Sequence, residues 1–179
     1  RHMTNAVRPI YSPDDLKGLK IRTQENEIHL QTFTDYGASP TPMAFTELFS
    51  AMQQGVVDGE ENPLSVIVPN KFYEVQKYIT LSSHFYQSAP FIINKQLFDN
   101  LSPETQQIIR EAAEVARDHE RKFIVDQDEA FLQTVIDNGM EVVYEDEFDR
   151  DAFVAASQNV YEKFKDQYGE IIERIKAVE

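Results

Sequence analysis

The sequence predicts an α/β domain followed by a mainly helical second half. In the first half the character of the sequence changes every dozen or so positions, as it does where short strands and helices alternate. From Ser102 onward, apolar residues recur with helical spacing and few turn signals interrupt them. Hydrophobic residues make up 41% of the chain, including 12 Phe and 8 Tyr, so a hydrophobic core is expected.

The first half is expected to contain short elements separated by turn residues. Ser12 and Pro13 are typical of a helix start, and Gly18 ends that helix before a strand. Two further helices are expected to end at Gly37 and Gly55. The expected segments are helices over residues 25–36 and 44–54, an extended segment over 41–43, and strands over 19–22, 56–57, 77–81 and 90–93.

One long helix dominates the second half. Ser102-Pro103-Glu104 has the residues of a helix N-terminus, and the apolar pattern continues to about Asn138 before Gly139 ends it. Globular helices average about 11 to 12 residues, so a helix of this length is expected to bridge two lobes or to pack against a partner. A strand over residues 141–144 and a final helical region interrupted near Gly169 complete the chain.

The charge and composition of the chain exclude several classes of partner. With 31 acidic and 17 basic residues the formal net charge is -14, whereas nucleic acids and anionic membrane surfaces attract basic proteins. No apolar run approaches the roughly 20 residues of a membrane-spanning helix, so neither nucleic-acid binding nor direct membrane insertion is expected. The chain has no cysteine, which excludes a disulfide framework and thiolate metal ligands.

No cofactor, metal or catalytic site is expected. The four histidines lack the short spacings of zinc ligands. Asp126, Asp128 and Glu129 resemble the opening of a calcium loop, but they lie in a helical pattern without the required glycine. Glu60 and Glu61 are adjacent and therefore a poor source of the two opposed carboxylates of a glycosidase. The chain is not expected to be an enzyme.

Three residues are candidates for binding a ligand. Arg22 ends an apolar strand, where its guanidinium group can give a carboxylate two parallel hydrogen bonds; an ordinary surface ion pair is the alternative. Asn62 lies in a polar loop expected over residues 58–63, where its amide can serve a ligand or form an Asn-Pro turn. Phe45 lies on an amphipathic stripe, so it can line a pocket or belong to the core.

Four segments occur in a distinctive order: Asp15–Arg22 (DLKGLKIR), Gly37–Met43 (GASPTPM), Glu47–Phe49 (ELF) and Gly55–Pro63 (GVVDGEENP). This succession resembles the DctP-type substrate-binding proteins of tripartite ATP-independent periplasmic (TRAP) transporters. The similarity continues through Lys77-Tyr78 and His84-Phe85-Tyr86 to Asn94-Lys95 and the long helix, and so covers nearly everything from Arg8 to the carboxyl end.

The resemblance implies a periplasmic-binding-protein-like lobe with a long bridging helix and carboxyl-terminal helices. It implies a periplasmic receptor, its signal peptide removed, that closes around a small organic acid and delivers it to TRAP permease subunits without catalysis. The implied ligand residues are Arg22, which pairs with the carboxylate, Asn62, which contacts the same ligand, Phe45, which lines the cleft, and, as weaker parallels, Tyr86 and Gln87.

The chain is shorter than the family pattern, which has on the order of a hundred further residues before the position of Arg8. We interpret residues 1–3 as a remnant of cloning, residues 4–85 as the second α/β lobe, and residues 86–179 as a crossover strand, the bridging helix and the carboxyl-terminal helices. Without the first lobe, apolar surface is uncovered, so self-association through the long helix or the strand around Phe91 is expected.

Two other classes of function remain open at this point. A helical protein-interaction or scaffold module would place the activity in the long helix, which is its only support. A hydrolase acting on small acids or sugars would be distinguished by turnover of its bound ligand.

The family pattern also has glutamine more often where this chain has Glu60, so the hydrogen bonds around that position are expected to differ.

Overall fold

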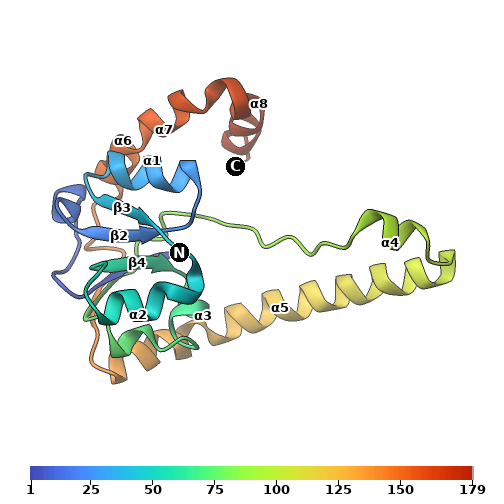
Figure 1. Ribbon diagram of the computed structural model, residues 1–179, viewed down its shortest axis with the longest axis horizontal. Helices are drawn as coiled ribbons and strands as arrows, with labels where there is room; N and C mark the ends of the chain where they lie inside the picture. The colour runs from blue at the N-terminus through green and yellow to red at the C-terminus, as the bar shows by residue number, and fades with distance from the viewer. Residues whose placement is uncertain (179) are drawn as a thin grey trace.

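The computed structural model describes residues 1–178 and shows a sheet domain from which one long helix extends (Figure 1). Within these residues six strands form a mixed sheet in the order β3-β2-β4-β1-β5-β6. β1 is antiparallel to both of its neighbours, whereas β2 is parallel to β3 and β4, and β5 is parallel to β6. The strands are β1 (His2–Asn5), β2 (Lys20–Thr23), β3 (Ser39–Pro42), β4 (Gly59–Asn62), β5 (Tyr78–Thr80) and β6 (Glu141–Val143).

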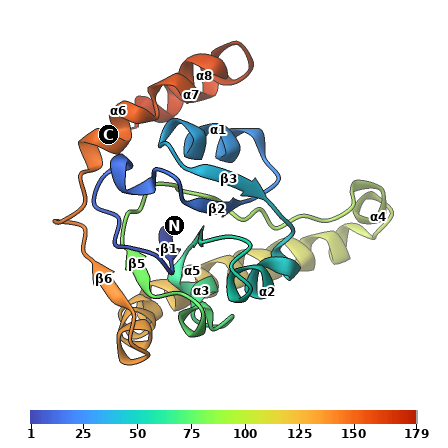
Figure 2. The same ribbon diagram turned by 60° about the vertical axis from the view of Figure 1, so that its left-hand side comes forward.

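Helices cover both faces of the sheet (Figure 2). α1, α6 and α7 lie over one face, and α2, α3 and the end of α5 lie over the other. The helices are α1 (Glu27–Asp35), α2 (Leu48–Gln53), α3 (Leu64–Ile67), α4 (Lys95–Asp99), α5 (Pro103–Asp137), α6 (Arg150–Ala156), α7 (Gln158–Lys163) and α8 (Lys165–Lys176), with short 3-10 turns η1 (Pro13–Leu16), η2 (Phe45–Glu47) and η3 (Phe72–Glu74).

Two hydrophobic clusters hold these layers to the sheet. On one face, Phe33 of α1 packs with Ile21 of β2 and Phe153 of α6. Complete burial of a side chain such as Phe33 stabilises the fold by about 1.5–3 kcal/mol. The cluster on the other face contains Leu48, Ala51, Met52, Val57, Leu64, Ile67, Phe72, Ile79, Leu81, Val135 and Met140.

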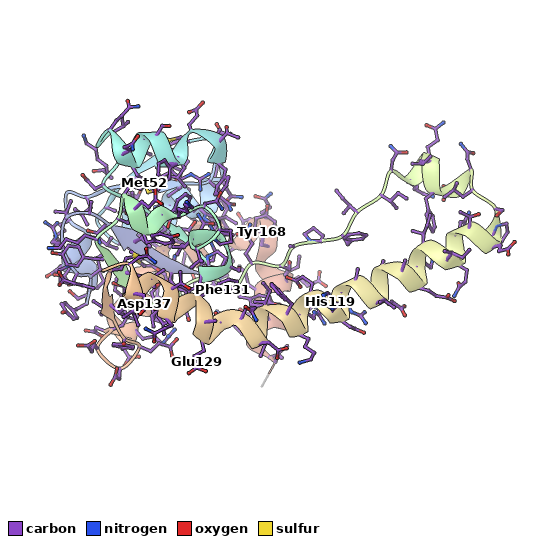
Figure 3. All side chains as sticks on the ribbon, turned by 90° about the horizontal axis from the view of Figure 1, so that it is seen from below. Met52, His119, Glu129, Phe131, Asp137 and Tyr168 are labelled. Atoms are coloured by element: carbon purple, nitrogen blue, oxygen red, sulfur yellow. The ribbon has the colours of Figure 1, made fainter. Side chains whose placement is uncertain are left out.

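α5 is a continuous helix of 35 residues, about 52 Å long at a rise of 1.5 Å per residue. Ser102 caps it by accepting a hydrogen bond from the main-chain N–H of Thr105, and Pro103 occupies its first turn. Figure 3 shows Phe131 where the helix lies against the domain and His119 where the helix has left it. We call residues 86–125, which run out along α4 and back along α5, the arm.

Several predicted elements are confirmed. The helix expected over 25–36 is α1, the strand expected over 77–81 is β5, and the strand expected over 141–144 is β6. The long helix predicted from Ser102 to about Asn138 matches α5 within a residue at each end. β6 adds a strand to the sheet of the first half, and α7 contacts α1, so elements of the second half pack against the first.

Residues 1–3 are part of this domain. His2–Asn5 pairs with β4 on one side and β5 on the other, so β1 is a central strand. Met3 is fully buried in the cluster that contains Phe33. The interpretation of these residues as a remnant of cloning stays a prediction, while β1 gives His2 and Met3 a structural role in the sheet.

The polar loop expected over residues 58–63 is wrong. β4 occupies most of it, and all four residues of Gly59–Asn62 are buried. The strand expected over 56–57 is wrong as well, because these residues precede β4 without joining the ladder. Residue type favoured a loop here, but the polar side chains of β4 can be buried because each finds a hydrogen-bond partner.

Two predictions for the second half are also wrong. The segment expected as a strand over 90–93 has no ladder partner among residues 1–178, and Phe91 and Ile92 are each 85% exposed. Gly169 lies inside α8 and does not interrupt the final helical region. The breaks occur instead at Ser157 and Phe164, between α6, α7 and α8.

Candidate functional site

The carboxyl ends of β2 and β4 bring Arg22 and Asn62 to one edge of the sheet. The two strands are adjacent and parallel, with Ile21 opposite Gly59. In Figure 1 the arrowheads of β2, β3 and β4 point toward the side on which the arm extends. In open α/β sheets, ligands bind outside the carboxyl ends of parallel strands, so this edge is the candidate site.

Arg22 is held rigidly, with part of its guanidinium group free. The residue is 4% exposed, and its Nε and Nη2 both donate to the main-chain carbonyl of Met43, at 3.1 and 2.9 Å. Burial lowers the pKa of Arg22, while the carboxylates of Glu60 and Glu61 raise it. The guanidinium group keeps its charge at neutral pH, because arginine is not deprotonated in proteins.

The remaining edge of this guanidinium group, between Nη1 and Nη2, can donate two parallel hydrogen bonds to a carboxylate. Arg22 takes part in none of the ion pairs formed within residues 1–178. The alternative of an ordinary surface ion pair is therefore wrong for this residue.

Phe45 lies beside Arg22 on η2. The centroid of its ring is 6.0 Å from Cζ of Arg22 and 6.0 Å from the centroid of the Phe72 ring. Phe45 is 43% exposed, whereas Phe72 is buried. The alternative that Phe45 belongs to the core is therefore wrong, and its outer surface forms an apolar patch next to the guanidinium group.

Asn62 ends β4, and its amide has a partner at each end. Nδ2 donates to Oε2 of Glu60 at 2.5 Å, and Oδ1 accepts from Nη2 of Arg1 at 2.9 Å. One hydrogen of Nδ2 and one lone pair of Oδ1 remain for a ligand. Asn62 belongs to the strand, and α3 follows directly after Pro63, so the alternative of a simple Asn-Pro turn is wrong.

Arg1 is a residue of this group that sequence analysis missed. Its Nε and Nη2 donate to the two carboxylate oxygens of Glu61, at 2.5 and 2.9 Å, and its Nη1 donates to Oε1 of Gln87 at 2.9 Å. Arg1 reaches Asn62 because β1 and β4 are antiparallel, with His2 opposite Asn62. No local sequence pattern reveals this pairing, and the interpretation of residues 1–3 as a remnant of cloning removed Arg1 from consideration.

Glu61 anchors Arg1 from the interior of the domain. Its carboxylate is fully buried, 3.4 Å from Nδ1 of His29 and 3.6 Å from Nε2 of His84. Burial alone would raise the pKa of Glu61, but the two imidazoles and the Arg1 guanidinium outweigh it and hold that pKa well below its usual range. Glu61 is therefore ionised at neutral pH and stabilises the charged form of Arg1.

The two weaker candidates lie differently. Gln87 joins the group through its hydrogen bond with Arg1 and also contacts Gln24, at 3.3 to 3.4 Å. Tyr86 is 95% exposed and lies outside the packed side chains. The structure thus brings together Arg22, Phe45, Asn62 and Gln87, with Arg1 added, and leaves Tyr86 apart.

Neither of two cavities in the described residues coincides with this edge. One, of about 270 Å³, is bordered by Tyr36, His84 and Phe153, and the other, of about 550 Å³, by Leu81 and Tyr144. Arg22, Phe45 and Asn62 line neither of them. Residues 1–178 contain no cluster of three or more His, Asp or Glu side chains arranged to hold a metal ion.

Comparison with known proteins places the chain in a family. The sequence pattern of the family described as DctP, "Bacterial extracellular solute-binding protein, family 7", matches residues 1–167. The chain belongs to this family. The match begins at residue 1, and so includes Arg1 and β1 in the family pattern.

Two DctP relatives cover most or all of this chain. A solute-binding protein of Verminephrobacter eiseniae is 43% identical over 180 residues, which cover 100% of this chain and 53% of the relative. The 2,3-diketo-L-gulonate-binding periplasmic protein YiaO of Escherichia coli is 37% identical over 159 residues, 89% of this chain and 48% of that protein. The chain thus spans about half the length of these curated relatives.

A solved structure confirms the predicted fold class, an α/β lobe with a long helix and carboxyl-terminal helices. The crystal structure of a TRAP periplasmic solute-binding protein from Polaromonas sp. JS666, bound to D-erythronate, has a TM-score of 0.95 at 40% identity. The similarity covers 99% of this chain and 58% of the Polaromonas chain. None of the helices formed by residues 1–178 combines the length and the apolar character that crossing a membrane requires.

Proposed function

We propose that the chain provides one lobe and the bridging helix of a periplasmic receptor that binds a small organic acid and delivers it to TRAP permease subunits. The observation that carries this proposal is the free Nη1–Nη2 edge of Arg22, oriented by the Met43 carbonyl at the carboxyl edge of the sheet. Such an edge suits a carboxylate, because it donates two parallel charge-assisted hydrogen bonds. The proposal contains no catalytic step, in keeping with a family of solute-binding proteins.

The proposed ligand is a small carboxylic acid with an oxygen atom on the carbon next to the carboxylate. D-Erythronate, bound to the Polaromonas protein, has a hydroxyl group there, and 2,3-diketo-L-gulonate, which the E. coli relative is named for, has a carbonyl group. In the proposed complex Arg22 binds the carboxylate and the free Nδ2 hydrogen of Asn62 meets the adjacent oxygen. Phe45 provides an apolar wall beside them.

Capture is proposed to be reversible and completed by closure of a second lobe over this edge. Phe45, 43% exposed beside Arg22, leaves apolar surface for a second lobe to cover, which favours such a step. The net charge of -14 does not prevent an anion from binding, because the ligand lies close to Arg22 while most surface carboxylates are distant and screened by salt. Tyr86, exposed at the start of the arm, is proposed to meet the ligand only after closure.

Calorimetry with D-erythronate tests the receptor function. The 179-residue chain is joined to the residues of the Polaromonas protein that it does not cover, and the acid is titrated into this chimaera. We expect saturable binding at one site per chain. A chimaera that is folded and binds neither D-erythronate nor 2,3-diketo-L-gulonate would contradict the proposal.

The arm is proposed to mediate self-association of the isolated 179-residue chain. Large exposed apolar patches mark surfaces that bind other proteins. The exposed apolar surface of the arm therefore favours self-association, and it also supports the alternative of a helical interaction module. The exposed apolar residues of the arm are Tyr86, Phe91, Ile92, Ile93, Leu97, Ile108, Val115, Phe123 and Val125.

In sedimentation velocity experiments the chain is expected to shift from monomer to dimer as its concentration rises. The double variant Val115→Glu with Phe123→Glu is expected to remain monomeric, because two charges then interrupt the apolar surface of α5. The matched control Glu114→Gln with Glu120→Gln alters neighbouring exposed residues of the same helix and should leave the association unchanged. A chain that stays strictly monomeric over a wide range of concentration rules the proposal out.

A further inference from the structure

A buried carboxyl group lies directly behind the ligand-facing amide of Asn62. Glu60 is fully buried in β4; its Oε2 accepts from Nδ2 of Asn62, and its Oε1 accepts from Oγ1 of Thr4 at 2.9 Å. Thr4 lies opposite Glu60 on β1, and its hydroxyl group is also 3.2 Å from Oε1 of Gln76. Gln76, Thr4, Glu60 and Asn62 thus lie in one row that ends at the site, in which the single Thr4 hydroxyl hydrogen can be donated either to Glu60 or to Gln76.

We propose that Glu60 is a positioning residue: its carboxyl group fixes the Asn62 amide for the ligand and takes up a proton when an acid binds. The inference rests on the function proposed above for Arg22 and Asn62. A carboxylate accepts hydrogen bonds and a guanidinium group donates them, so Nδ2 of Asn62 faces Glu60 and Oδ1 faces Arg1. If the amide were flipped, Oδ1 of Asn62 would face the carboxylate of Glu60, and both groups are acceptors. Nδ2 of Asn62 would face the guanidinium group of Arg1, and both groups are donors.

The same row accommodates Glu60 with or without its proton. In the ionised form, Oε1 accepts from Thr4 and Oε2 accepts from Asn62. After a solvent proton adds to Oε1, the new O–H donates to Oγ1 of Thr4, the Thr4 hydroxyl hydrogen turns to Oε1 of Gln76, and Oε2 still accepts from Asn62. Burial raises the pKa of Glu60 to about 7, so both forms are present near neutral pH.

The charges that surround Glu60 determine the direction of the effect. Arg22 on β2 and Arg1 just before β1 favour the ionised form, whereas Glu61, the next residue of β4, disfavours it. His2 on β1 stays neutral near pH 7, because burial lowers its pKa to about 4. A ligand carboxylate adds a negative charge close to Glu60 and therefore favours the protonated form. Acid binding is expected to strengthen as the pH falls through the pKa of Glu60.

Nuclear magnetic resonance of the 179-residue chain tests the positioning role without any ligand. The side-chain amide signal of Asn62 is followed from about pH 5.5 to 8.5, and it is expected to titrate with a midpoint near the pKa of Glu60, about 7. In Glu60→Gln the signal should not titrate, since the new Nε2 donates to Thr4 and Oε1 still accepts from Asn62. Glu141→Gln, an exposed carboxyl group on the edge strand β6, is the matched control. A titration that is absent in the unaltered chain, or unchanged in Glu60→Gln, overturns the proposal.

Calorimetry with D-erythronate in the chimaera tests the proton uptake. Binding is expected to be about tenfold tighter at about pH 6 than at about pH 8.5. At the higher pH, ionised Glu60 and the ligand carboxylate are two like charges that repel each other in a partly buried site. Glu60→Gln should bind equally at both pH values within about threefold, and Glu60→Leu should lose about tenfold at both because Asn62 is no longer held. A pH profile that is the same in Glu60→Gln as in the unaltered protein contradicts the proton uptake. If no acid binds at any pH, the receptor function fails, and the resonance titration of Asn62 still decides whether Glu60 holds its amide.

Discussion

Arg22→Lys is expected to weaken the binding of D-erythronate at least tenfold, and Arg22→Ala about a hundredfold. Arg22 donates from Nε and Nη2 to the Met43 carbonyl and keeps the Nη1–Nη2 edge for the ligand carboxylate. A lysine ammonium group cannot bind the carbonyl and the carboxylate at once in this geometry. A hundredfold loss corresponds to about 2.7 kcal/mol, within the range for removing one partner of a buried charge pair. Calorimetry in the chimaera measures the loss directly.

The control for this prediction is Arg117→Lys, on the exposed surface of α5. Its guanidinium group is half exposed and pairs with the neighbouring Asp118, so affinity should change by less than about twofold. Urea unfolding of each variant separates a loss of binding from a loss of folding. Affinity that is unchanged in Arg22→Lys would show that the carboxylate is not held by this guanidinium group.

Gly59→Ala is expected to lower the free energy of unfolding by about 3 kcal/mol. A methyl group at Gly59 would lie 2.1 Å from the carbonyl oxygen of Thr4 and 2.7 Å from Cβ of Asn5. These atoms belong to β1, which pairs with β4, so the two central strands would have to move apart. The same movement would separate Glu60 from Thr4, and urea unfolding measures the cost.

Gly169→Ala provides the matched control for that substitution. Gly169 lies within α8, where an added methyl group would meet only Cγ of Lys165, at 3.7 Å. Alanine favours a helix interior over glycine by about 0.5–1 kcal/mol, so this variant should be as stable as the unaltered chain or more so. Equal stability of the Gly59 and Gly169 variants would contradict the close approach of β1 and β4.

The elements that sequence patterns predicted well are those with a strong local signal. The helix cap at Ser102 and the apolar spacing that follows it define α5 almost to the residue. Arg22 was found because it ends the apolar strand over residues 19–22, and the strand order then places it at a sheet edge. Phe45 was a candidate from its amphipathic stripe and from the family resemblance, while its exposure depends on packing that the stripe does not reveal.

The elements that sequence patterns missed depend on pairing between distant parts of the chain. β4 and β1 carry several polar residues. They can be buried because Glu60 accepts a hydrogen bond from Thr4, and Glu61 accepts one from Arg1, across the ladder. Arg1 and Asn62, which share a hydrogen bond, are 61 positions apart. Neither strand has the alternating apolar pattern from which strands are normally recognised. Local sequence alone therefore led to the interpretation of β4 as a polar loop and of residues 1–3 as a remnant of cloning.

A crystal structure of the chimaera with D-erythronate tests the central claim most directly. We predict that the two carboxylate oxygens lie about 3 Å from Nη1 and Nη2 of Arg22, while Nδ2 of Asn62 donates both to Glu60 and to the oxygen next to the carboxylate. Phe45 should cover one side of the ligand. An acid bound with its carboxylate away from Arg22, or an Nη1–Nη2 edge occupied by another protein group while the acid is bound, would contradict the account.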